Sequence, residues 1–367
     1  MTLTDIQSNQ QLRHYEFPVS TRCTYLAHAG VCPLPRRVAS ALADYALATQ
    51  HGDQEILAPD QLVPQTRNLA AKLIGVHPDE ISFVGPTSLA LSLVANGLPF
   101  KPGDNILIYP NDYPSNVYPW MMLAQRGIEV RHLKTHALGC IEPEDVLTQV
   151  DRRTKLVALA SCHFVSGWRI DHDTIGRALR ERGIWFCLDA IQTLGAAPLS
   201  GRYVDFLAAD AHKWMLGPCS AGILYVRKEM KEILQPTAVG WNNALCPRFV
   251  AQNNIIFHHD GRRYEPGTMN LLGLVGLKAA LELILEIGLE NITAQLRKQR
   301  ELLAEELQTR GFVVLHPDAP PTNTAGILSF CTVNSDIRMI YSNLLKGNIT
   351  TSRRADRPGQ FYVRVSP

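Results

Sequence analysis

The sequence has no long apolar run and no excess of charge of either sign. Its longest apolar runs, such as LVALA (156–160) and GILYV (222–226), are far shorter than the roughly 20 residues that a helix needs to span a bilayer. The N-terminal segment MTLTDIQSNQ is polar and lacks the apolar core of a signal peptide. Lysine and arginine number 36 against 34 acidic residues, without a basic stripe. We therefore expect neither a membrane nor a nucleic acid as partner.

Cysteine and glycine motifs are also absent. The eight cysteines include no CxxC pair and are irregularly spaced. In a chain of this length they are typical of small buried residues in a reducing compartment, so we predict a cytoplasmic protein without a metal site. The segment GPTSLALSLVANG (85–97) has neither a GxGxxG pattern nor a Walker lysine. This argues against an unrelated doubly wound nucleotide-binding protein.

The middle of the chain alternates short apolar runs with helical patterns. Two segments, 118–127 and 173–183, have helical spacing. The run IWFCLDA is apolar nearly throughout, as expected of a strand that is covered on both faces. This order predicts an α/β fold with a mostly parallel sheet wrapped by helices. The predicted strands are 105–110, 128–133, 155–161, 184–190, 204–210 and 221–227.

The alternation of strand and helix patterns ends at about residue 261. Residues 271–311 read as one long helix or as two helices joined near Gly288. The apolar runs 312–315, 325–333 and 361–366, with a short helical stretch at 336–346, then predict a small α+β C-terminal domain. We therefore divide the 367 residues into a large domain (22–270) and a small domain (1–21 and 271–367) that includes the long linking helix.

An acid and a lysine follow neighbouring predicted strands. Asp189 ends IWFCLDA, and Lys213 lies 24 residues later in DAHKWMLGP (210–218). Taken singly, Asp189 could cap a helix and Lys213 could be a surface lysine. Together at the carboxyl edge of a parallel sheet they suit pyridoxal 5'-phosphate, which needs a lysine for a Schiff base and a carboxylate at its pyridine nitrogen.

A phosphate group would need donors, and FVGPTSLALSLVANGL (83–98) offers them. A strand ends there, and Thr87 and Ser88 open an apolar helix whose free N–H groups suit an oxyanion. An ordinary helix cap is the alternative. His212, beside the lysine, is a second candidate donor, although it could equally be a core histidine.

The order of several motifs resembles one family. LDAIQTLGAAPL, ADAHKWMLGPCSAGILYVR and YEPGTMN follow one another as in class V aminotransferases, which are fold-type I pyridoxal phosphate enzymes. The segments YLAHAGVCPLP and VRVSP also fit, so the resemblance covers nearly the whole chain. The family includes cysteine desulfurases, selenocysteine lyases and isopenicillin N epimerase-like proteins, and the HKW…GP form is most similar to the last of these.

The resemblance implies a role for each matching residue at the cofactor. Lys213 would form the internal aldimine and move the Cα proton, and Asp189 would pair with the pyridine nitrogen. Gln192 would bond the phenolic oxygen, and Tyr113 would stack on the ring. The remaining cofactor contacts are to the phosphate: Thr87, His212 and more weakly Ser88 from the same chain, and Gly267 and Thr268 from the neighbouring subunit of a homodimer.

Three further residues are implied at the substrate. Arg364 of VRVSP matches the arginine that binds the α-carboxylate, for which a guanidinium fork is well shaped. Phe164 falls where desulfurases carry an asparagine. Arg169 would contact substrate or form an ion pair with Asp171. Each of these residues taken singly has an ordinary structural interpretation.

Two departures from the family pattern stand out. Cysteine desulfurases need a nucleophilic cysteine on a small-domain loop, but residues 347–367 contain none, and Cys331 lies in an apparent strand. Asp210 stands where relatives often have a hydroxyl residue, and it would repel a phosphate unless it points away or orients His212. We predict an enzyme acting at Cα of an amino acid through aldimine and quinonoid intermediates, by lyase, epimerase or aminotransferase chemistry. The alternatives are C–S or C–Se cleavage without a persulfide cysteine, and a non-catalytic cofactor-binding homologue.

Overall fold

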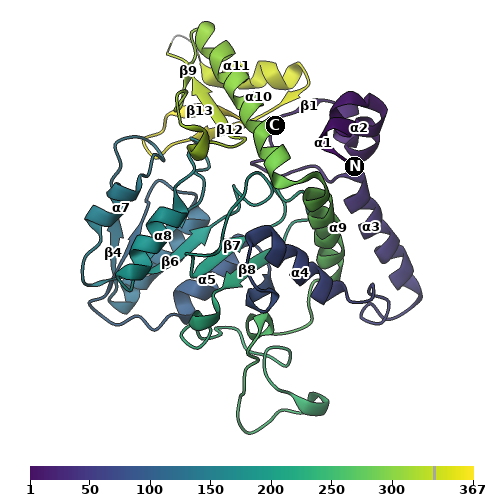
Figure 1. Cartoon of the computed structure of the whole chain (residues 1–367), viewed down its shortest axis with the longest axis vertical. Coiled ribbons are helices and arrows are strands. Elements are labelled where there is room, and N and C mark those ends of the chain that lie inside the picture. Colours follow the sequence, from purple (N-terminus) through teal and green to yellow (C-terminus); the bar gives the residue numbers. More distant parts are fainter. Residues whose placement is uncertain (334–335) are drawn as a thin grey trace.

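A seven-stranded, mostly parallel sheet forms the centre of the chain in a computed structural model that describes residues 1–333 and 336–367 (Figure 1). Strand β8 is antiparallel to both of its neighbours, and the other pairs are parallel. The predicted mostly parallel sheet is thereby confirmed. In spatial order its strands are β2 (Ile81–Val84), β8 (Gly222–Val226), β7 (Phe206–Ala209), β6 (Trp185–Asp189), β5 (Thr154–Ala160), β3 (Asn105–Ile108) and β4 (Glu129–His132).

The central part of this sheet is buried on both faces. Successive side chains of a strand point to opposite sides, so each face packs in its own apolar cluster. In β5, Val157 and Leu159 join one apolar cluster, while Leu156 and Ala158 join another. Helices α4 (Leu62–Ile74), α8 (His172–Glu181) and α9 (Leu271–Ile287) contribute to the first cluster. Helices α5 (Thr87–Gly97) and α6 (Tyr118–Met121) contribute to the second. The central strands β7 and β8 are therefore apolar throughout rather than alternating, whereas the edge strand β4 is polar and partly exposed.

Helical segments differ in detail from the sequence prediction. The predicted helix 118–127 is α6 followed by a 3₁₀ segment, Met122–Arg126, which ends at Gly127 with φ 77°. The long segment after residue 270 is two helices, α9 and α10 (Leu289–Thr309), which meet at Gly288 with φ 89°. The other helices of the large sheet region are α3 (Arg36–Ala48) and α7 (Pro143–Gln149).

A second, antiparallel sheet forms the C-terminal part of the chain. Its order is β12 (Ser352–Ala355), β13 (Phe361–Val365), β10 (Leu328–Cys331) and β9 (Val313–Val314). Helix α11 (Ile337–Lys346) packs on it through Ile337. Cys331 lies in β10 as predicted and is partly buried. In Figure 1 this small sheet sits at one end of the molecule, above the carboxyl edge of the central sheet.

The N-terminal segment reaches the small sheet. After α1 (Leu3–Ser8) and α2 (Gln10–Glu16), strand β1 (Thr24–Tyr25) pairs in parallel with β11 (Ile349–Thr350). Ala27 forms a further bridge with Ser366. This pairing carries Ala29 and Gly30 into the space between the two sheets. The division at residue 271 remains a prediction. Across the described residues, no helix is both long and apolar enough to cross a membrane.

Candidate active site

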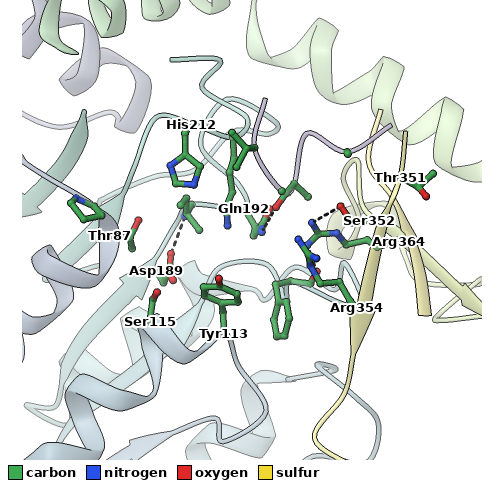
Figure 2. A pocket seen from close by; sticks show the side chains of 18 of the residues that line it. Thr87, Tyr113, Ser115, Asp189, Gln192, His212, Thr351, Ser352, Arg354 and Arg364 are labelled. Atoms are coloured by element: carbon green, nitrogen blue, oxygen red, sulfur yellow. Dashed lines mark hydrogen bonds between the residues drawn. The ribbon is translucent and has the colours of Figure 1, made fainter. Parts of the chain in front are cut away.

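A pocket of about 550 Å³ lies between the carboxyl edge of the central sheet and the small sheet (Figure 2). Nine of the twelve predicted site residues line it, although they are spread over nearly 280 positions of the chain. They come from the loops after β3, β5, β6 and β7, from the start of α5 and from β13. The nine are Thr87, Ser88, Tyr113, Phe164, Asp189, Gln192, His212, Lys213 and Arg364.

Lys213 lies in a tight turn that follows β7. Gly217 N donates to Ala211 O at 3.0 Å, which closes the turn. The loop after β6 packs against this turn at Gly195 (φ 92°), where an added Cβ would lie 2.2 Å from Trp214 O. A side chain at position 195 would therefore push the lysine segment away from the sheet edge. Trp214, beside the lysine, is buried.

The amine of Lys213 is buried and forms no direct ion pair with a described residue. The residue is 8% exposed, and no hydrogen bond or ion pair to Nζ is found among the described residues. Nζ lies 5.3 Å from the centre of the Tyr113 ring. Burial lowers the pKa of Lys213 to about 8, with Arg364 and Arg354 adding to the effect and Asp189 opposing it. The lysine is thus tuned toward its neutral form.

Asp189 ends β6 and is 4% exposed. Its Oδ1 accepts a hydrogen bond from Ile191 N at 3.0 Å, whereas no described residue donates to Oδ2. Burial raises the pKa of Asp189 to about 6, against the Ile191 hydrogen bond and the charge of Lys213. A cationic or N–H partner in the pocket would stabilise the carboxylate.

Gln192 is fixed by two neighbours. Its Oε1 accepts from Trp214 Nε1 at 3.0 Å, and its Nε2 donates to Ala29 O at 3.1 Å. One N–H of the amide is left over, since a primary amide carries two donors. The Gln192 side chain therefore joins the N-terminal segment to the lysine turn, and its second N–H group is available to a ligand in the pocket.

The start of α5 supplies donors at the other end of the pocket. The first N–H groups of a helix have no carbonyl partner within the helix, and Pro86 at the cap position provides no side-chain acceptor. Thr87 Oγ1 accepts from Asp210 N at 2.9 Å, so its hydroxyl proton remains free to donate. Ser88 Oγ lies 2.8 Å from Ser115 Oγ. Such a group of donors suits an anion.

Asp210 points away from this group of donors. It is 2% exposed; its Oδ1 accepts from Ala211 N at 2.8 Å, and its Oδ2 accepts from Ser220 N at 3.0 Å. The same Oδ2 lies 2.9 Å from His212 Nδ1, and this nitrogen must carry a proton because the carboxylate only accepts. Asp210 thus orients His212, which Figure 2 shows on the same side of the pocket as Thr87 and Asp189.

The small sheet closes the opposite wall. Arg364 is 1% exposed, and its guanidinium donates to Phe164 O at 2.7 Å and to Ser352 Oγ at 3.4 Å. Burial lowers the pKa of Arg364 to about 9, and the charge of Arg354 adds to the effect. Tyr113 is 44% exposed, and its ring meets that of Phe164 edge to face at 5.3 Å. One ring face of Tyr113 is therefore open to the pocket.

Sequence reasoning missed several lining residues on the same wall. The lining residues Thr350, Ser352 and Arg354 belong to β11 and β12, and Thr351 lies between these strands. Tyr25 and Gly30 come from the N-terminal segment. The cluster of hydroxyl and basic residues in TTSRR was a signal for this wall. Ser115 lies two residues after the predicted Tyr113 and also lines the pocket.

Three predicted residues do not line the pocket. Arg169 is buried, and its Nη2 donates to Pro198 O at 3.0 Å. Asp171 caps α8 by accepting from Thr174 N and forms no ion pair with Arg169. Gly267 and Thr268 line two neighbouring hollows instead, one with Gly85 and Ser220 and the other with Trp241 and Ile56. We leave Arg169 out of the proposed site.

No cysteine lines the pocket among the described residues. Cys162 is 1% exposed, and burial raises its pKa to about 12, so its thiol is not an accessible nucleophile. The connection between β12 and β13 is a short hairpin, with Ala355 paired to Phe361 and Gly359 at φ 98°. Asp356 closes it by accepting from Gln360 N at 2.7 Å.

Comparisons with known proteins agree with this geometry. The family model described as aminotransferase class-V matches residues 24–353. A probable cysteine desulfurase of Methanothermobacter thermautotrophicus is 29% identical over 328 residues, which make up 88% of this chain and 81% of the relative. The apo structure of a cysteine desulfurase from Thermococcus onnurineus superposes with a TM-score of 0.86 at 24% identity, covering 97% of this chain and 92% of that one. A cystine C–S lyase solved with its product cysteine persulfide gives 0.84 at 24% identity over 95% and 94%.

Proposed function

The chain belongs to the class V aminotransferase family, and from this premise we propose that it uses pyridoxal 5'-phosphate to act at Cα of an amino acid. The observation that carries the proposal is the amine of Lys213, which is buried, forms no hydrogen bond or ion pair with a described residue, and shares one pocket with the carboxylate of Asp189. A buried amine that forms no hydrogen bond or ion pair is costly unless its charge is removed, and a covalent bond to an aldehyde removes it.

The pocket residues fit this cofactor. Lys213 would hold it covalently, and the unoccupied Oδ2 of Asp189 would accept from its ring nitrogen. Its phosphate would be held by the first N–H groups of α5 together with Thr87, Ser88 and His212. These groups are donors, and the N–H groups and the Thr87 hydroxyl proton have no acceptor within α5 itself. The spare N–H of Gln192 and the open face of Tyr113 suit its remaining polar and aromatic surfaces. A volume of about 550 Å³ lies within the range of small-molecule sites.

The chemistry then divides among the chain's own groups. The bound cofactor supplies an electron sink for the bonds at Cα of the substrate. Arg364 would hold the α-carboxylate, for which its buried guanidinium offers charge-assisted hydrogen bonds. Lys213, once its amine is released, would take the Cα proton, because a pKa of about 8 leaves a usable neutral fraction near pH 7. Asp189 would keep a proton at the ring nitrogen, and Tyr113 would cover one face and exclude water.

The step after removal of the Cα proton decides the reaction type. The proton can return to Cα or to the cofactor, or a substituent can leave from the substrate side chain. Elimination, epimerisation and transamination all begin with the same Cα step, and we assign none of them. Direct C–S or C–Se cleavage is a second candidate, and the names of the relatives, cysteine desulfurase and cystine C–S lyase, favour the C–S bond. It would have to proceed without a persulfide on the enzyme, since the pocket has no cysteine among its described lining residues and the β12–β13 hairpin is short.

A homodimer is part of the proposal. The segment 236–260 extends from the large domain in Figure 1 and exposes large apolar side chains, among them Trp241 (44%) and Phe249 (79%). Ile56, 81% exposed, lines the same surface as Trp241, Gly267 and Thr268. An apolar surface of this kind is typical of an interface between protein chains. It supports a dimer in which Gly267 and Thr268 reach the partner's phosphate site. A cytoplasmic location remains a prediction.

The test is the spectrum of the holoenzyme together with exchange of the Cα proton. Wild-type protein loaded with pyridoxal 5'-phosphate should absorb in the visible region and should incorporate deuterium at Cα of at least one amino acid from a panel. Lys213→Met should lose both signals, whereas Lys231→Met, which replaces a buried lysine elsewhere, should keep both. Visible absorbance in the wild type with no exchange for any amino acid would support the non-catalytic alternative. A Lys213→Met protein that still catalyses exchange would refute the lysine assignment.

A further inference from the structure

The pocket wall formed by the small sheet carries more positive charge than the proposed cofactor and an α-carboxylate require. Among the described residues that line the pocket, Asp189 is the only carboxylate, while Lys213, Arg354 and Arg364 are cationic. The phosphate-binding end has its own donors at α5 and His212. One α-carboxylate at Arg364 would therefore leave the charge of Arg354 without a partner.

Arg354 shares a face of the sheet with Arg364. Ser352 is paired with Arg364 across β12 and β13, and Arg354 follows Ser352 by two residues, so both arginine side chains leave the same face. Figure 2 shows their two guanidinium groups converging in the pocket. The pKa of Arg364 is lowered by burial and next by the charge of Arg354, which shows that the two charges are close.

The donors on this wall are only partly used. Arg354 Nη1 donates to Arg353 O at 2.9 Å, but Arg354 Nε has no partner among the described residues. Arg364 Nε and the buried Thr351 Oγ1 also have none. No carboxylate contributes to the pKa of Arg364. Two like charges held together with unused donors are unfavourable, and an anion between them would satisfy both the charge and the donors.

We propose that Arg354 binds an anionic group on the side chain of the substrate, while Arg364 holds the α-carboxylate. The substrate class is then an amino acid with an acidic side chain, either a carboxylate or a sulfur oxyacid. This inference rests on the proposed function, because it takes the amino acid as given and specifies its side chain. Arg354 acts as a specificity residue and takes no part in the Cα step.

The test compares near-isosteric ligands on the holoenzyme. L-Aspartate and L-asparagine differ mainly in the charge of the side chain, as do L-glutamate and L-glutamine. Dissociation constants are measured by calorimetry and by the change in cofactor absorbance. The wild type should bind one acid about 10- to 100-fold more tightly than its amide, the range expected for a charge-assisted hydrogen bond. Arg354→Met should abolish this preference by weakening the acid alone.

Two further variants separate charge from structure. Arg354→Lys should retain part of the preference, because it keeps the charge but loses the fork. Arg353→Met is the matched control, since Arg353 is the exposed neighbour on the same strand and lies over the Phe361 ring, 5.3 Å from its centre. It should leave both dissociation constants unchanged. If Arg354→Met fails to load cofactor, Arg354→Gln serves for the same comparison.

Equal affinity of the wild type for acid and amide in both pairs would overturn the inference. So would an Arg354→Met protein that weakens acid and amide by the same factor, because Arg354 would then act on the α-carboxylate or on the fold. Failure of the proposed function itself looks different. In that case wild-type protein shows no lysine-dependent visible band and binds none of the four amino acids.

Discussion

Replacing Lys213 by methionine should stabilise the apoprotein, although it removes the residue that we propose holds the cofactor. Lys213 is 8% exposed, has no acceptor for its amine, and has its pKa lowered from 10.5 to about 8, chiefly by burial. Each tenfold change in an acid dissociation constant corresponds to about 1.4 kcal/mol. At pH 7 the buried charge therefore costs the folded apoprotein about 3 kcal/mol. Methionine is of similar length and carries no charge.

The sign of the pH dependence follows from the lowered pKa. Below pH 8 the lysine is protonated in both states, so the whole cost is present and the wild type is the less stable protein. Between pH 8 and pH 10.5 the unfolded chain holds the proton and the folded chain does not, so the wild-type free energy of unfolding rises with pH. The advantage of Lys213→Met should therefore shrink across this window.

Urea unfolding of the two apoproteins at pH 7 and pH 9.5 measures this difference. Lys231→Met is the control, because Lys231 is also buried but donates to Asp79 O at 2.8 Å and to His259 O at 3.1 Å. Its removal leaves two carbonyls without a donor and should lower the free energy of unfolding by about 1–3 kcal/mol. The reasoning is refuted if Lys213→Met is no more stable than the wild type at pH 7, or if the difference is the same at both pH values.

Two other predictions concern the phosphate end of the pocket and the proposed dimer. Asp210→Asn should lower the free energy of unfolding of the apoprotein by about 1–3 kcal/mol, because an NH₂ group would face Ser220 N and His212 Nδ1 in place of an accepting oxygen; unchanged urea unfolding would contradict these hydrogen bonds. Trp241→Glu combined with Phe249→Glu should convert a dimer into a monomer in light scattering, since it places charge on the exposed apolar segment. A wild type that is already monomeric at micromolar concentration would refute the dimer.

The central sheet and the Lys213–Asp189 pair were predictable because they depend on local patterns and one topological rule. Strands buried on both faces carry continuous apolar runs, such as LVALA in β5 and WFCL in β6, and parallel strands end at the same edge of a sheet. Residues that directly follow neighbouring parallel strands then lie near one another at this edge, whatever the length and sequence of the loops. The same logic explains why Thr87, at the first turn of α5, was found from sequence.

Arg354 could not be found in this way, since its position depends on strand register. Arg353 and Arg354 are adjacent in the sequence, and only the pairing of Ser352 with Arg364 decides which of the two faces the pocket. Arg169 shows the converse. It lies eight residues after the predicted strand 155–161, but the bridge between Cys162 and Arg169 belongs to a turn that leads its side chain to Pro198 O. Long-range pairing of this kind leaves no periodic trace in the sequence.

The hairpin β12–β13 lacks a cysteine and carries Arg354, and these two features concern the same wall of the pocket. The resemblance implies that the cysteine loop of desulfurases corresponds to residues 347–367, which contain no cysteine. This region includes the short hairpin that Asp356 and Gln360 close. The first strand of the hairpin places Arg354 at the pocket. This side chain is a hydrogen-bond donor and not a nucleophile. On our proposal this wall would bind and orient a negative group, and its described lining residues include no cysteine that could accept sulfur from the substrate. We infer that this part of the fold selects the substrate, and that the bond-breaking chemistry is left to Lys213 and the cofactor.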